Sequence, residues 1–69
     1  MKTLLLDGSE SVADLAGRMG VAPADVVRVG FERLGLMLTL AEHRDRPEVV
    51  RIGEAFGYRV RFAGDGPGA

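Results

Sequence analysis

The chain has 69 residues and no cysteine, and its formal net charge at pH 7 is −1. This length allows one small domain, which can be held neither by disulfides nor by a metal on thiolates. The 46% hydrophobic content argues against disorder, and the near-neutral charge gives no overall attraction to nucleic acid.

The chain opens with a predicted strand over residues 2–6, KTLLL, which ends at the turn residues Asp7 and Gly8. This apolar run is far too short for the core of a signal peptide or for a membrane span. We therefore expect a soluble, cytoplasmic protein that makes no membrane contact.

Two helices are predicted next, joined by a turn that contains glycine. Ser11 is a good N-cap and Asp14 lies three residues later, close to a capping box, so the first helix is expected over 12–19. Gly20 is placed to end that helix in a left-handed conformation. The second helix is expected over 23–34, with a proline in its first turn.

The apolar residues of the second helix predict which of its faces is buried. The spacing assigns to the core Val27, Gly30, Phe31 and Leu34. The opposite face then carries Arg28, Val29 and Arg33. A glycine inside a helix costs roughly 1 kcal/mol relative to alanine, so Gly30 indicates close packing against a neighbouring backbone.

The second half of the chain contributes two further predicted strands around a third helix. The run LMLTL, residues 36–40, predicts a strand, and residues 41–45 predict a polar loop. Asp45 or Arg46 is expected to cap a helix that begins at Pro47. The final strand, YRVRF over 58–62, alternates strictly and is therefore expected to bury one face and expose the other.

The predicted order of elements is β-α-α-β-α-β. The simplest arrangement is a small α+β domain over residues 1–63, with a three-stranded sheet and the helices packed on one of its faces. Its first two helices form a corner like a helix-turn-helix. Residues 64–69, GDGPGA, are expected to be a flexible tail.

A DNA-binding regulator is an alternative function for the chain, because helix-turn-helix motifs that read DNA have the same layout as this corner. The end of the second helix that would meet the bases offers Asp25, which repels phosphates. The donors for this alternative are Arg28 and Arg33.

Arginines in the second half of the chain support a different hypothesis, contact with RNA phosphates. These residues are Arg44, Arg46, Arg51, Arg59 and Arg61. If the third helix covers one face of the sheet, we expect them to converge at one edge. The alternative is a solvated rim whose charge is offset by Glu42, Asp45, Glu48 and Glu54.

A third hypothesis is a surface for protein interaction or self-association. It rests on apolar side chains expected outside the core, namely Val26, Val29 and Met37.

The sequence shows no motif for catalysis, for a metal or for a cofactor. His43 is the one histidine, and no second imidazole or thiolate exists to share a metal with it. The glycines lie at turns, at helix ends and in the tail, and do not form a phosphate loop. We therefore expect a protein that is not an enzyme and takes no small-molecule substrate.

Four segments resemble a known family: SVADLAGRMGV, ADVV, RLGLMLTL and EVVRIGEAFGYRV. They are similar to the small N-terminal domain that precedes the GTPase domain in bacterial translation initiation factor two. The resemblance covers about residues 2–62, although the family's usual Asn-Gln after the middle strand is Ala41-Glu42 here. It implies a docking module that contacts the ribosome, RNA or a translation partner. Because no phosphate loop is present, the resemblance does not extend to GTP hydrolysis.

Overall fold

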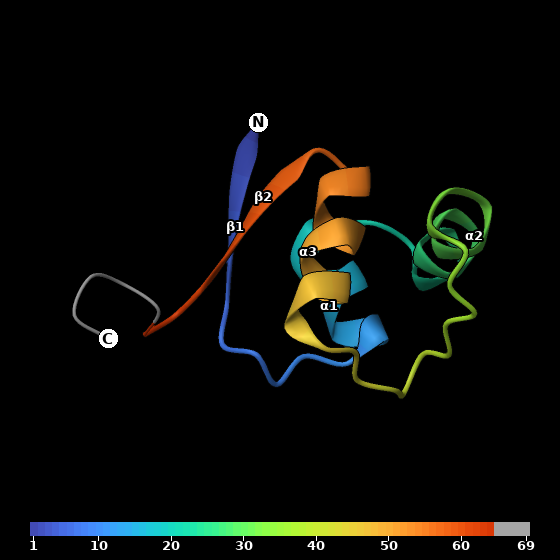
Figure 1. Ribbon diagram of the computed structural model, residues 1–69, viewed down its shortest axis with the longest axis horizontal. Helices are drawn as coiled ribbons and strands as arrows, with labels where there is room; N and C mark the ends of the chain where they lie inside the picture. The colour runs from blue at the N-terminus through green and yellow to red at the C-terminus, as the bar shows by residue number, and fades with distance from the viewer. Residues whose placement is uncertain (65–69) are drawn as a thin grey trace.

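The first and last elements of the chain pair with each other in a parallel two-stranded sheet. The computed structural model describes residues 1–64, so the predicted tail, apart from Gly64, lies outside the described residues. The elements are β1 (Lys2–Leu6), α1 (Val12–Met19), α2 (Pro23–Leu34), α3 (Arg46–Ala55) and β2 (Tyr58–Phe62). Helices α1 and α3 lie on one side of the sheet, and α2 lies beyond them (Figure 1).

Helix α1 forms as its capping residues predict. The Ser11 hydroxyl accepts a hydrogen bond from the Asp14 amide, and the Asp14 carboxylate accepts one from the Ser11 amide. Gly20 ends the helix in the left-handed region with φ of 70°. The helix buries the apolar face that its spacing predicts, which is Val12, Leu15, Ala16 and Met19.

Helix α2 has the predicted bounds, and its buried face is predicted in part: Gly30 is buried, and Val27 and Leu34 are half-buried against the core. Val26 and Val29 are 0% and 8% exposed, whereas Phe31 is 58% exposed. Apolar residues occupy more than half of the helix circumference, so their spacing allows more than one buried face. Packing against the rest of the chain selects the observed one: a Cβ added to Gly30 would lie 2.6 Å from Cδ1 of Leu38.

The segment 36–40 forms no strand, so the described residues hold a two-stranded sheet and not the predicted three-stranded one. Its polar backbone finds other partners. The Ala13 amide donates to the Leu40 carbonyl, and the Val12 amide donates to the Glu42 carbonyl just after the segment. These carbonyls are the hydrogen-bond acceptors for the first two amides of α1. Leu38 is buried in the core. The apolar run is therefore a core-packing loop.

Helix α3 begins after Asp45, whose carboxylate accepts a hydrogen bond from the Glu48 amide at 3.0 Å. The cap is therefore Asp45 and not Arg46. The helix packs closely on β2, because a Cβ on Gly53 would lie 2.3 Å from Cγ2 of Val60. This glycine determines how near α3 lies to the sheet.

The core lies between the sheet and the three helices. Its fully buried side chains come from four elements and are Leu6, Leu15, Ile52, Val12 and Val26. The half-buried Tyr58 hydroxyl donates a hydrogen bond to the Met19 carbonyl at 3.0 Å and so links β2 to α1. The core thus fixes β1, β2 and all three helices relative to one another.

Candidate binding surface on the open face of the sheet

The parallel register decides which side chains share a face of the sheet. Thr3 lies opposite Arg59 and Leu5 opposite Arg61, while Leu4 and Leu6 lie opposite Val60 and Phe62. Leu4 and Leu6 are buried beneath the helices. The alternate residues therefore point away from the helices. We call this set the open face; it consists of Thr3, Leu5, Arg59 and Arg61.

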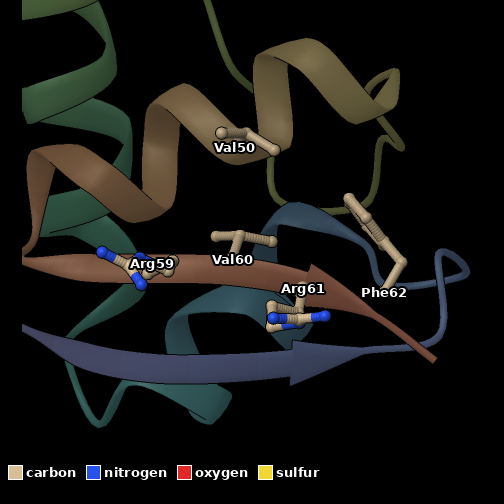
Figure 2. A pocket seen from close by; sticks show the side chains of 5 residues that line it. All are labelled: Val50, Arg59, Val60, Arg61 and Phe62. Atoms are coloured by element: carbon tan, nitrogen blue, oxygen red, sulfur yellow. The ribbon is translucent and has the colours of Figure 1, made fainter. Parts of the chain in front are cut away.

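Arg59 and Arg61 are the chemically distinctive residues of the open face. Both are exposed, and within residues 1–64 neither side chain makes a hydrogen bond or an ion pair. Figure 2 shows them projecting from the same strand. The strict alternation of YRVRF predicts this arrangement correctly. Two cationic groups are thus held side by side on one strand, and no carboxylate of residues 1–64 neutralises them.

Arg44, by contrast, is a structural residue. Its guanidinium lies 2.7 Å from Glu42 and 3.5 Å from Glu48, and it donates to the Met37 carbonyl at 3.0 Å. These contacts tie the loop before α3 to the helix. Hydrogen bonds from Thr39 are the main cause that lowers the pKa of Glu42, and Arg44 lowers it further.

The five arginines predicted as one patch therefore do not share one environment. Arg46 stacks over the Phe62 ring, 4.6 Å from its centroid, at the start of α3. Arg51 is exposed on α3, away from the buried side of that helix. The structure places Arg59 and Arg61 together on the open face and leaves the other three on or before α3.

The two arginines of the DNA-binding alternative also differ. Arg28 lies 3.4 Å from Asp25 and 3.1 Å from Glu32, and these hydrogen bonds raise its pKa. Arg33 is exposed and makes no such contact among residues 1–64. The corner between α1 and α2 is present, but the Arg28 guanidinium is already paired with two carboxylates of α2.

The three residues of the protein-interaction hypothesis are also separated. Val26 and Val29 lie in the core, which corrects the prediction that they face outward. Their burial follows from the packing of α2 described above, in which Gly30 lies against Leu38. Met37 alone stays at the surface, with 82% of its area exposed.

A groove beside β2 was not predicted. It has a volume of about 340 Å³ and is lined by Val50, Arg59, Val60, Arg61 and Phe62. Val50 lies on α3 across from Val60, and the arginines border the groove (Figure 2). The half-buried Val50 follows Val49 in the sequence, so the helix pattern gives a weak signal that it borders the core without entering it.

The chain has a net charge of −1, yet Arg59 and Arg61 have no acidic partner among residues 1–64, because many carboxylates lie elsewhere. Many carboxylates are occupied by local contacts. Hydrogen bonds from Ser9 lower the pKa of Asp7, and those with Ser11 lower the pKa of Asp14. Net charge therefore says little about this surface. Within residues 1–64 no group of three or more potential metal ligands occurs, and no helix there is long and apolar enough to span a membrane.

Comparison with known proteins relates the chain to a translation factor. The chain is 35% identical over 60 residues to a translation initiation factor IF-2 from Synechococcus sp.. The alignment covers 87% of this chain but 6% of that much longer protein. No protein-family model matches the chain. The chain is therefore similar to a short part of an initiation factor.

Proposed function

We propose that this protein is a non-enzymatic binding module of the translation apparatus that contacts ribosomal RNA through the open face of its sheet. The observation that carries the proposal is the pair Arg59 and Arg61, exposed on one strand without an ion pair among the described residues. The similarity to part of an initiation factor supports a role in translation.

The chemistry of this pair suits phosphate. Guanidinium groups present a planar fork of donors that matches phosphate oxygens, and they stay charged at all physiological pH values. Residues two apart on a β-strand are separated by roughly 6.6 Å, so the two guanidinium groups can contact separate phosphates of one RNA chain. Because Thr3, Leu5, Arg59 and Arg61 include no aromatic ring for stacking on bases, we expect little sequence preference.

Co-sedimentation with small ribosomal subunits tests the proposal, with binding to duplex DNA measured in parallel. We expect the protein to pellet with the subunits at low salt, to be released at moderate salt, and to leave the DNA unbound. Binding to DNA with no binding to the subunits would favour the helix-turn-helix alternative. Binding to neither would overturn the RNA proposal.

A matched pair of double variants assigns the surface. Arg59→Ala with Arg61→Ala removes two charges from the open face, and Arg28→Ala with Arg33→Ala removes two from α2. We expect the first double variant to lose binding to the subunits and the second to keep it. Equal losses would show that total charge, and not the open face, determines binding.

A further inference from the structure

The outer edge of β2 has backbone groups that meet no partner among residues 1–64. The Ala63 amide donates to the Leu6 carbonyl, which fixes the direction of the ladder. Since alternate residues of a parallel strand point to opposite sides, Arg59 and Arg61 direct their amides and carbonyls toward β1. The backbone of Val60 therefore points away from β1. Within residues 1–64, the amide and the carbonyl of Val60 make no backbone hydrogen bond on that outer side.

The two edges of the sheet differ in how they are covered. On the β1 side, the Arg18 guanidinium from α1 donates to the Leu5 carbonyl. On the β2 side, the groove described above lies between the strand and α3, with Val50 as its apolar wall. Edge strands without cover pair readily with other extended chains. The β2 edge thus borders a groove, whereas a guanidinium already occupies the Leu5 carbonyl of the β1 edge.

A second copy of this chain is a poor occupant of that edge. An antiparallel pairing of two β2 strands centred on Val60 would set Arg59 of one copy opposite Arg61 of the other. Like charges directly opposite each other destabilise a sheet. The same arginines would attract a strand that carries carboxylates at those positions.

We propose that the β2 edge binds an extended acidic segment of a protein partner, which adds to the sheet as a third strand. In such a strand the side chains alternate between the two faces. Acidic residues would lie opposite Arg59 and Arg61 on the open face, and the apolar residue between them would face Val50. The partner sequence is therefore a short alternation of acidic and aliphatic residues. This inference uses the backbone edge and the groove, and does not depend on RNA binding.

Amide exchange measured by NMR tests the proposal directly, with the blocked heptapeptide Ser-Glu-Val-Glu-Val-Glu-Ser as the probe. In the free protein we expect the Val60 amide to exchange fast and the Arg61 amide to exchange slowly, because only the latter is bonded to β1. Saturating peptide should slow exchange at Val60 at least tenfold. A scrambled peptide with its three glutamates adjacent should leave Val60 unchanged. Unchanged exchange with the alternating peptide, or equal protection by the scrambled one, would overturn the proposal.

Two variants test the groove against simple charge attraction. Val50→Glu places a carboxylate on the apolar wall, and Val27→Glu makes the same change at another half-buried helical valine, on α2. We expect the first variant to weaken peptide binding at least tenfold and the second to leave it unchanged, both measured by fluorescence anisotropy after circular dichroism confirms folding. Arg59→Ala with Arg61→Ala should cost about fivefold, as expected for two cross-strand charge pairs. Equal affinities for the two valine variants would contradict a site in this groove.

An RNA heptamer distinguishes the two kinds of ligand. Phosphates that contact only the arginine side chains leave the Val60 amide in fast exchange. Protection of Val60 by RNA equal to that by the peptide would contradict strand addition as the cause.

Discussion

The two faces of the sheet use the same ten strand residues for different purposes. The covered face contributes Leu4, Leu6 and Val60 to contacts beneath α1 and α3. The open face presents Arg59 and Arg61 to solvent, beside a Leu5 that is 55% exposed. Because neighbouring residues of a strand point in opposite directions, stability and binding can be changed separately within β1 and β2. The following predictions test that separation.

The largest effect is expected on the covered face of β1. Leu6→Ala should lower the free energy of unfolding by about 2–5 kcal/mol, because it leaves a cavity at a side chain that is 1% exposed. That is a large share of the roughly 3–10 kcal/mol expected for a domain of this size. Leu5→Ala is the matched control and should change stability by less than about 0.5 kcal/mol. Urea denaturation measures both, and similar losses for the two variants would refute the separation of faces.

A smaller loss is expected where α3 meets β2. Gly53→Ala should destabilise by about 1–3 kcal/mol, because the new methyl group would overlap Val60 and force α3 away from the strand. Gly17→Ala is the control, since nothing lies within 4 Å of a Cβ at that exposed position of α1. It should stabilise by up to about 1 kcal/mol. Thermal unfolding of both variants compares them, and a stable Gly53→Ala protein would show that α3 is not held closely by this glycine.

Acid should lower the stability of the fold, because three of its carboxylates accept hydrogen bonds that favour their charged form. The pKa values of Asp7, Asp14 and Glu42 are lowered in the folded chain, chiefly by hydrogen bonds from Ser9, Ser11 and Thr39 respectively. A lowered pKa stabilises the fold above the ordinary values of 3.8 and 4.5, and this contribution is lost as the pH falls through the folded values. Asp14→Asn, which removes the carboxylate that accepts from the Ser11 amide, should therefore flatten the acid limb of a stability-against-pH curve measured by urea denaturation. An unchanged slope would show that the Asp14 cap contributes nothing.

The smallest effect on stability is expected on the open face. Arg59→Ala with Arg61→Ala should change the free energy of unfolding by no more than about 0.5 kcal/mol, because neither side chain has a partner in residues 1–64. Arg44→Ala, which breaks contacts to Glu42, Glu48 and Met37, should cost more. Calorimetry of the two variants ranks them, and the reverse order would show that the open face is part of the structural framework.

Local chemistry determines the parts of the structure that the sequence predicts correctly. The Ser11 cap, the left-handed Gly20 and the alternation over 58–62 each depend on neighbouring residues, and the structure confirms all three. The open position of Arg59 and Arg61 follows from the same alternation. This part of the candidate surface could be predicted without knowing the fold.

Contacts between distant parts of the chain determine the features that the sequence predicts wrongly. The run 36–40 has the composition of a strand, but its backbone caps the first turn of α1 and Leu38 packs beside Gly30. Val29, next to Gly30 on α2, is buried as well. The groove was missed for the same reason, since its wall on α3 and its floor on β2 meet only after folding.

Salt dependence of binding to small ribosomal subunits tests the central claim most directly. The slope of log affinity against log salt should be less steep by about 1.4–1.8 in the Arg59→Ala, Arg61→Ala protein, as expected when two phosphate contacts are lost. The Arg28→Ala, Arg33→Ala protein should keep the slope of the unmodified chain. An unchanged slope in the first protein, or an equal change in both, would contradict the assignment of binding to the open face.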